Sequence, residues 1–376
     1  MQAERPRGIT SCPEVTIDEV KDFVSLRPKS SPTIPLAFIS FCVNWWGVMA
    51  ISMWAKPWVR WWRTAKHAMP PLFARRRETL PGPEYHFAFI GCQRSGTHLL
   101  REIINSSPYI ALMVETFSPT RKSIYWCNYV HRLGKHEFPP LTPYAAMKTF
   151  DKYMRRIARD VHIEHEWYGG PKPCLKALGL DIKYNQLKGM TSLSIDLTSR
   201  PLLLDYFQSR KFRVLHVVRK NIAQASISHI LASMRKVWHN YNDATSFQRK
   251  YHIPWPELHS QMWWMKQERE EFERLSQDLP VLPCVYEDLV EDLRRTGPSG
   301  VLPGDSVVLG PLARFLGVPN HFVYDGRMRK VVNKPYAEII ENFDELIAEL
   351  RNSSFAEFAD TLIDSPACAT VKSRAA

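Results

Sequence analysis

A glycine-bounded loop follows a strongly apolar run near residue 90. Phe87–Ile90 is apolar, and the chain continues Gly91-Cys-Gln-Arg-Ser-Gly-Thr-His98. The two glycines have the spacing of loops that wrap a phosphate group with backbone N–H groups at a helix start. An NTPase loop would continue with Lys and then Ser or Thr, whereas Thr and His follow here. The cation instead lies inside the loop, at Arg94, so the lysine that reaches the terminal phosphates of a nucleoside triphosphate is missing.

The side chains of this loop suit an anionic ligand. Ser95 and Thr97 offer hydroxyl groups, Arg94 offers a charge, and a helix that begins at Thr97 would present its positive end. An ordinary glycine turn between strand and helix is the structural alternative, and the position directly after a buried strand argues against it. We expect the anion site to include Gly91, Cys92, Gln93, Arg94, Ser95, Gly96, Thr97 and His98.

A second polar cluster follows another apolar run. Phe212–Val218 is rich in β-branched residues and predicts a strand that ends at Arg219 and Lys220. A helical pattern follows and carries Ser226 and Ser228. A basic helix start with solvated hydroxyl groups would have the same pattern.

A carboxylate follows the short apolar run Ile110–Val114. Because the carboxyl ends of parallel strands share one edge, Glu115 is expected near the loop. A carboxylate there can take a proton from a hydroxyl group. His98 adjoins the loop and is the alternative base, and a surface turn is the alternative place for Glu115.

These segments resemble those of sulfotransferases that use 3′-phosphoadenosine 5′-phosphosulfate (PAPS). In that family a Lys or Arg precedes Ser-Gly-Thr in the loop that binds the 5′-phosphosulfate, and Arg94 matches it. A strand-end Arg followed eight residues later by Ser binds the 3′-phosphate there. Ser228 lies eight residues after Lys220, whereas Ile227 lies eight after Arg219, so this chain departs from the pattern by one residue.

Three further segments resemble the same family over about residues 85–350. Glu115-Thr-Phe-Ser-Pro119 resembles the general-base segment of lipopolysaccharide-type and glycolipid sulfotransferases, and Val285-Tyr-Glu-Asp-Leu-Val290 resembles a segment that ends a late strand. Arg329-Lys330 resembles a basic segment that closes over the nucleotide. The resemblance implies catalytic roles for Arg94, Glu115 or His98, and nucleotide binding by the loop, Arg219, Lys220, Ser226, Ser228, Arg329 and Lys330.

The resemblance also implies PAPS as co-substrate, no metal, and a hydroxylated acceptor such as a glycan or glycolipid. A P-loop kinase is the alternative enzyme. Two features argue against it: the missing lysine, and the lack of a clear carboxylate at the end of a core strand. A non-catalytic nucleotide-binding membrane protein also stays open. We expect no nucleic acid as a partner, because the basic, aromatic-rich residues 54–77 follow an apolar run that suggests a membrane collar.

Strands alternate with helices along the chain, which predicts an α/β fold with a P-loop-NTPase-like parallel sheet covered by helices on both faces. Strands are expected near 85–90, 110–114, 179–187, 212–218 and 281–286. Helices are expected near 201–209, 221–238, 256–278, 309–316 and 336–350. The aromatic- and His-rich residues 121–170 are expected to form a partly helical insertion that shapes an acceptor pocket.

Composition agrees with an anionic partner. The chain has 376 residues and a formal net charge of +12 at pH 7, which favours nucleotides, acidic glycans or anionic membranes without choosing among them. The 7 cysteines are widely spaced and form no C-x-x-C pair. A disulfide framework or a zinc site is therefore not expected.

The N-terminal region differs from the rest. Residues 1–30 are polar, and 31–80 begin with an uncharged, Trp-rich apolar stretch that basic residues follow. This pattern predicts membrane attachment through residues 31–66, as a single-pass anchor or an interfacial helix, and a buried helical hairpin is the alternative. The basic excess after the stretch favours the cytosolic face, whereas a carbohydrate sulfotransferase of the Golgi lumen needs the opposite orientation. The sulfotransferase domain is expected over 81–364, with a disordered tail over 365–376.

Overall fold

A computed structural model describes most of the chain from residue 83 onward. The described residues are 83–118, 125–133, 142–161, 172, 174–191, 200–236, 249–295, 300, 305–324 and 334–363. The predicted N-terminal segments 1–30 and 31–80, Arg329, Lys330 and the tail 365–376 lie outside these ranges. Within the described ranges, no helix is both long enough and apolar enough to cross a bilayer.

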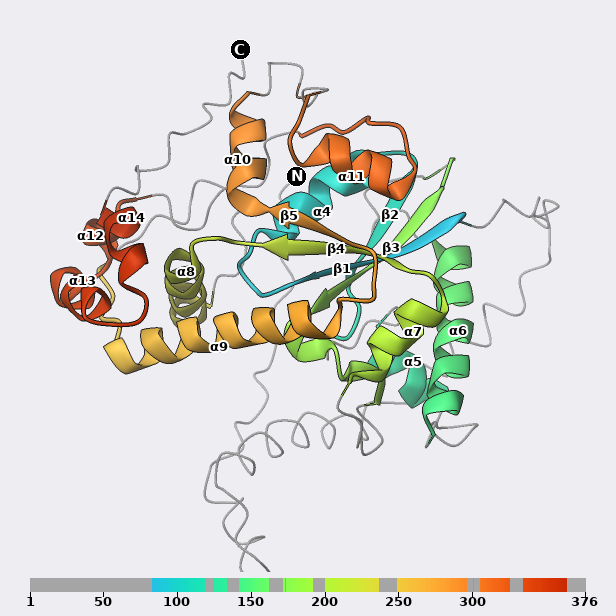
Figure 1. The fold of residues 1–376 in the computed structure, drawn as a ribbon, viewed down its shortest axis with the longest axis horizontal. Coiled ribbons are helices and arrows are strands. Elements are labelled where there is room, and N and C mark those ends of the chain that lie inside the picture. Colours follow the sequence, from blue (N-terminus) through green and yellow to red (C-terminus); the bar gives the residue numbers. More distant parts are fainter. Residues whose placement is uncertain are drawn as a thin grey trace, which may run out of the picture. The chain divides into compact units, whose positions relative to one another are not determined.

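The core of the fold is a five-stranded parallel sheet in the order β2-β3-β1-β4-β5 (Figure 1). The strands are β1 (Tyr85–Gly91), β2 (Ile110–Glu115), β3 (Ala177–Lys183), β4 (Arg213–Val218) and β5 (Val281–Val285). β1 therefore lies in the middle, and the loop after it emerges where the carboxyl ends of its neighbours meet. The predicted α/β class with a parallel sheet is confirmed.

The central strands are buried on both faces, which explains their nearly continuous apolar sequences. All of β3 is buried, and so is β1 from Phe87 onward. Close packing fixes one glycine here, because a Cβ atom on Gly179 would lie 2.2 Å from the ring of Phe87 in the neighbouring strand. The middle of the sheet is thus held by packing that leaves little freedom in strand position.

Helices cover both faces of the sheet. One face packs against α4 (Thr97–Ser106), α10 (Tyr286–Arg294) and α11 (Leu309–Leu316). The other packs against α5 (Trp126–Leu133), α6 (Pro143–Asp160), α7 (Leu202–Ser209) and the end of α9 (Trp255–Leu275). A separate apolar cluster joins α8 (Ile222–Arg235) and α9 to the C-terminal helices α12 (Tyr336–Ile339), α13 (Phe343–Arg351) and α14 (Ala359–Ile363).

Three predicted elements differ in detail. β3 ends at Lys183, and a 3-10 turn over Tyr184–Gln186 replaces the rest of the expected strand because the Gln186 side chain accepts a hydrogen bond from the Lys183 N–H. The helix expected over 336–350 is two helices, because Ile340 is extended and pairs with Tyr251. The aromatic residues of α5 and α6 are mostly buried against the sheet, so in the described part of 121–170 they form core rather than an acceptor pocket.

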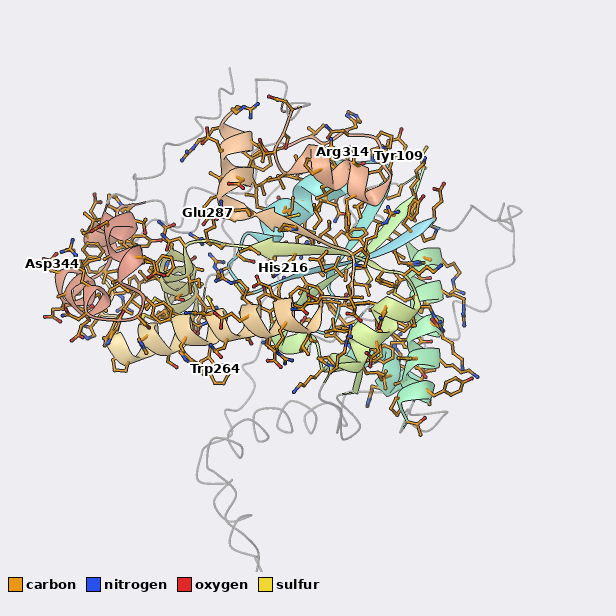
Figure 2. All side chains as sticks on the ribbon, viewed as in Figure 1. Tyr109, His216, Trp264, Glu287, Arg314 and Asp344 are labelled. Carbon is orange, nitrogen blue, oxygen red and sulfur yellow. The ribbon has the colours of Figure 1, made fainter. Side chains whose placement is uncertain are left out.

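A buried histidine faces α9 beneath the sheet (Figure 2). The His216 ring of β4 lies 4.7 Å from the Phe272 ring, and its Nε2 is 2.5 Å from the Tyr184 hydroxyl. Burial, with a smaller contribution from Arg269, lowers the pKa of His216 to about 4. The folded protein therefore keeps this imidazole neutral well below the pH at which an exposed histidine is protonated.

This burial predicts a loss of stability in acid. The unfolded state takes up the His216 proton near pH 6.5, whereas the folded state resists until about pH 4, so acidification through this window favours unfolding, by roughly 3 kcal/mol in total. His216→Gln keeps a partner for Tyr184 but cannot titrate. Urea unfolding at several pH values should therefore show a shallower decline from pH 6.5 to 4 in the variant. Equal declines in both proteins would contradict the assignment.

Candidate functional site

The loop between β1 and α4 adopts a backbone that its sequence permits at few positions. Arg94 has a φ of 66° and Gly96 a φ of 86°, both in the left-handed region. A Cβ atom on Gly96 would lie 2.2 Å from the Tyr286 ring, and one on Gly91 would lie 2.8 Å from the Val217 carbonyl oxygen. Both glycines are thus required by close approach of neighbouring groups. A non-glycine residue held at positive φ is the kind of strain that accompanies functional sites.

The two predicted anion clusters meet at Arg94. Its guanidinium donates to the Ser228 hydroxyl on α8, with Nε and Nη2 at 3.1 and 3.0 Å from Oγ. Arg219, at the end of β4, donates from Nη1 to the Arg94 carbonyl oxygen at 3.1 Å and from Nη2 to Gln224 at 3.1 Å. Residues far apart in sequence therefore form one cationic, hydroxyl-bearing group.

The electrostatics of this group favour an anion. Burial, followed by the charge of Arg219, lowers the pKa of Arg94 to about 10, so Arg94 is still a cation at neutral pH. Arg219 lies over the Tyr286 ring, 4.9 Å from its centroid, and its Nε is buried without a hydrogen-bond partner among the described residues. Two like charges and an unsatisfied donor are stabilised when a phosphate or sulfate accepts from them.

The remaining predicted residues of these clusters have other neighbours. Lys220 forms an exposed ion pair with Asp288 at 3.4 Å, and Ser226 is fully buried, with its hydroxyl 3.4 Å from the sulfur of Met265. The structure therefore directs these two side chains away from Arg94. Within the loop, Ser95 is buried and donates to the Cys92 carbonyl oxygen at 2.8 Å, which fixes the turn, and Gln93 is half-buried.

Cys92 is partly buried. Its side chain lines a small cavity with Tyr184, Met265 and Arg269 beneath the loop. Burial raises the pKa of this thiol to about 11, although the Ser95 hydrogen bond opposes the rise.

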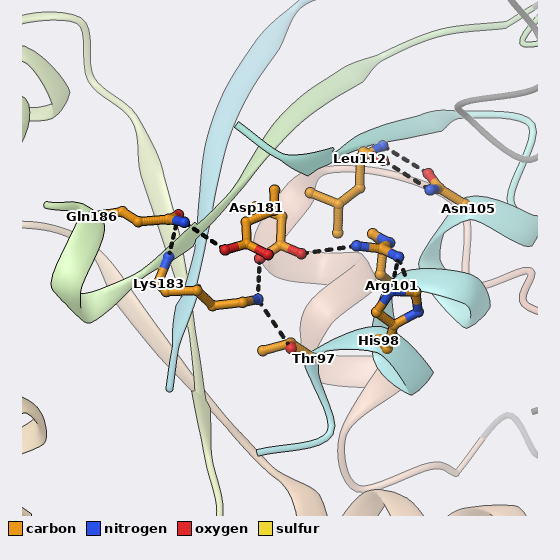
Figure 3. Close-up of polar contacts among 9 residues, drawn as sticks. Thr97, His98, Arg101, Asn105, Leu112, Asp181, Lys183 and Gln186 are labelled. Carbon is orange, nitrogen blue, oxygen red and sulfur yellow. Dashed lines mark hydrogen bonds and ion pairs between the residues drawn. The ribbon is translucent and has the colours of Figure 1, made fainter. Parts of the chain in front are cut away.

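A second charged group lies on the α4 side of the loop (Figure 3). The Lys183 amine donates to the Thr97 hydroxyl at 3.0 Å and to Asp181 Oδ1 at 2.6 Å. Arg101, one turn into α4, donates to Asp181 Oδ2 at 3.0 Å. All three charged side chains are buried. Two cations face one carboxylate, so the group holds one net positive charge next to the loop.

The sequence motifs did not indicate Asp181, Lys183 and Arg101 as site residues. A signal was available, because Asp181 and Lys183 are polar residues two apart in an otherwise apolar run. Side chains two apart in a strand point to the same face. Burying two charges on one face of such a strand is costly unless they are paired, so they indicate either an ion-pair partner or a functional role. Arg101 lacked such a signal, since a cation on an amphipathic helix usually faces water.

The two proposed bases differ in their surroundings. Glu115 ends β2 and accepts a hydrogen bond from the Gln186 amide, whose oxygen in turn accepts from the Lys183 backbone. Glu115 therefore lies in the same hydrogen-bond network as Lys183. His98 lies against Arg101, whose Nη2 is 2.9 Å from Nδ1. A ring that already accepts from a guanidinium is less suited to take a proton from an acceptor.

Asp181 and Glu115 belong to no metal-ligand cluster among the residues that the structure describes. Within the described ranges, no three His, Cys, Asp or Glu side chains come together in a way that could hold a metal ion. Both Asp181 oxygens accept from cations, so this donor set is poorly suited to a divalent metal.

Comparison with known proteins gives distant structural similarity. No protein-family model matches the chain, and no curated protein does. Among solved structures, a sulfotransferase from Alicyclobacillus acidocaldarius is similar at 13% identity over 76% of this chain and 96% of that one, with a TM-score of 0.35. The sulfotransferase domain of the Synechococcus PCC 7002 olefin synthase is similar at 17% identity over 76% and 95%, with a TM-score of 0.32.

A sulfotransferase domain from the curacin biosynthetic pathway is similar at 13% identity over 67% of this chain and 77% of that one, with a TM-score of 0.32. Identities and TM-scores this low do not assign a family. The function is therefore inferred from the site's own residues.

The close approach of Tyr286 to the loop predicts the effect of one substitution. Gly96→Ala should lower the free energy of unfolding by roughly 1–3 kcal/mol, because it combines a strained φ with a clash against the Tyr286 ring. Chemical denaturation measures this loss. In the Tyr286→Ala background the clash is absent and the φ strain persists, so the same substitution should cost less there. An equal cost in both backgrounds would contradict the contact.

Proposed function

We propose that the protein is a sulfotransferase that moves a sulfuryl group from PAPS to a hydroxyl group of an acceptor. The observation that carries this proposal is the contact between Arg94 and Ser228, with Arg219 bound to the Arg94 backbone. It joins the phosphate-type loop to a second cationic cluster at the next strand. PAPS carries anionic groups at both its 5′ and 3′ positions, so two adjoining anion sites suit it better than a single phosphate.

The roles follow from position. The loop amides, Arg94 and the α4 start would hold the 5′-phosphosulfate, and Arg219 with Ser228 would hold the 3′-phosphate. Lys183 extends the first site, because its amine contacts Thr97 and belongs to a buried group with one net positive charge. Such a charge stabilises an anion in a dry site without reorganisation.

The reaction is a displacement at sulfur. The acceptor oxygen forms a bond to sulfur as the bond between sulfur and the 5′-phosphate oxygen breaks, and the acceptor proton passes to the Glu115 carboxylate. The products are a sulfate ester and adenosine 3′,5′-bisphosphate. Negative charge grows on the leaving phosphate, so Arg94 and Lys183 bind the transition state more strongly than the ground state.

The surroundings of Asp181 weigh against the kinase alternative. Asp181 lies in the strand beside β1, where an ATPase would place the carboxylate that helps to hold Mg²⁺. Here Arg101 and Lys183 take up both of its oxygens. A non-catalytic nucleotide-binding protein would bind donor and product but leave labelled PAPS unconsumed.

The acceptor and the location are part of the proposal. A glycan or glycolipid acceptor rests on the sequence resemblance, and membrane attachment rests on residues 31–66, outside the described part of the chain. We propose attachment to the Golgi membrane or to the cytosolic face of a membrane. Fractionation of the full chain at high salt and at alkaline pH distinguishes a spanning helix from a basic surface contact.

The deciding experiment is transfer of label. The purified protein, radiolabelled PAPS and a total glycolipid and glycan extract should yield labelled ester and adenosine 3′,5′-bisphosphate in equal amounts. Binding of adenosine 3′,5′-bisphosphate should exceed binding of ATP or single-stranded DNA. Preference for ATP together with phosphate transfer would support the kinase instead.

Arg219→Ala tests the 3′-phosphate assignment. The variant should bind adenosine 3′,5′-bisphosphate about 10–150-fold more weakly, because a charge-assisted hydrogen bond contributes roughly 1.5–3 kcal/mol. Adenosine 5′-phosphate, which lacks the 3′ group, should bind with nearly unchanged affinity. Titration calorimetry with both ligands measures the difference. Equal losses would assign Arg219 a purely structural role in holding the Arg94 carbonyl.

Lys183→Met tests the added cation. The substitution keeps the length of the side chain and removes its charge, so turnover should fall on the order of 10²-fold while product binding changes far less. Single-turnover rates and product affinity are the measurements. Lys188→Met, an exposed site on the same segment, is the matched control and should behave as wild type. A rate near wild type for Lys183→Met would remove Lys183 from the chemistry.

A further inference from the structure

Gln186 lies between Glu115 and Lys183, the proposed base and one of the proposed anion-binding cations. Its Nε2 is 2.5 Å from Glu115 Oε1, and its Oε1 is 3.0 Å from the Lys183 backbone nitrogen. The side chain therefore connects the end of β2 with the end of β3. It is half-buried and belongs to the 3-10 turn that ends β3.

The orientation of this amide is determined by its partners. The Lys183 N–H can only donate, so the Gln186 oxygen must face it. The amide nitrogen must then face Glu115, where it donates to the carboxylate. Turning the amide over would set oxygen against oxygen and nitrogen against N–H. The turn thus fixes which atom Gln186 presents to Glu115.

The other carboxylate oxygen is available. Gln186 engages Glu115 Oε1, and Oε2 accepts no hydrogen bond from the described residues. A carboxylate held at one oxygen keeps the second for a proton from a substrate.

Residue 183 joins this arrangement to the loop. Its backbone orients Gln186, while its side-chain amine contacts Thr97 and Asp181. The cation at the loop and the carboxylate at β2 are thereby set by one short turn.

We propose that Gln186 is a positioning residue that fixes the Glu115 carboxylate and aims its second oxygen at the acceptor hydroxyl. This inference rests on the proposed sulfuryl transfer, in which Glu115 is the base. Gln186 acts through Glu115 and touches neither donor nor acceptor. Its removal should therefore matter only while Glu115 is a carboxylate.

A double-mutant cycle tests this dependence. Gln186→Met removes both hydrogen bonds with little change in length, and should slow transfer of label from PAPS to the glycan and glycolipid extract about 10–100-fold. In the Glu115→Gln background the same substitution should have almost no further effect. Gln208→Met, at an exposed position of α7, is the control and should leave the rate unchanged. Additive losses would assign Gln186 to the fold or to another step.

A pH series gives a readout that a structural role would not move. Gln186→Glu has the same size and places a second carboxylate against Glu115, so the acidic limb of the rate profile should move up by about one pH unit or more. Affinity for adenosine 3′,5′-bisphosphate should stay within about twofold. A uniform fall in rate with an unmoved limb would overturn the proposal, and this variant decides the matter if Gln186→Met is unstable.

The NMR chemical shift of the Glu115 carboxyl carbon separates this inference from the proposed function. At neutral pH this shift should differ between Gln186→Met and the otherwise unaltered protein, whether or not sulfuryl transfer occurs, because the variant lacks the hydrogen bond to Oε1. A wild-type protein that never consumes PAPS would defeat the sulfotransferase proposal. An unmoved shift in the variant would defeat the role of Gln186.

Discussion

The site depends on the ion pairs that the buried carboxylate of Asp181 forms with two cations. This carboxylate accepts from Arg101 on α4 and from Lys183 at the end of β3, and it is nearly inaccessible to solvent. Charges withdrawn from water need this pairing, because an unpartnered one costs several kcal/mol. Without Asp181, two cations would remain close together in a dry interior. The helix that follows the loop and the strand beside it are thus tied by one group, and the Lys183 amine is held at Thr97.

The other flank of the loop is supported by helices that come late in the chain. The α8 helix carries Ser228 and packs with α9 and α12–α14 in one apolar cluster. Tyr336 of α12 belongs to that cluster and is buried, which raises the pKa of its hydroxyl, while the charges of Arg219 and Arg94 oppose the rise. The C-terminal helices therefore do more than cover the sheet. They support, through this cluster, the helix that carries Ser228.

Much of the fold could be predicted from sequence, because buried parallel strands are continuous apolar runs and the loop glycines have a fixed spacing. The run over 212–218 and the helix over 309–316 are examples that the structure reproduces closely. The Asp181 network was harder to predict from sequence, since it depends on which strands are neighbours in the sheet. β3 lies between β1 and β2 although it follows both in sequence. Local pattern does not contain that information.

The same reason limited the prediction of individual site residues. Arg94 and Ser228 could be proposed from motifs, but their contact depends on the packing of α8 against the sheet. Ser226, only two residues away, turns to Met265 instead because a helix rotates successive side chains by about 100°. Glu115 could be placed at a strand end. Its partner Gln186 could not be predicted, because Gln186 belongs to a turn in a segment whose sequence predicted a strand.

The raised pKa of the partly buried Cys92 thiol has a consequence for chemical reactivity. A thiol in a phosphate-binding loop invites the expectation that oxidants or electrophiles would inactivate the protein. Thiolate is the reactive form, and a pKa near 11 leaves very little of it at neutral pH. Cys174 is exposed and is the described cysteine that such reagents would reach first. The loop cysteine is therefore a small packing residue of low reactivity, and among the described cysteines labelling should begin at Cys174 rather than in the loop.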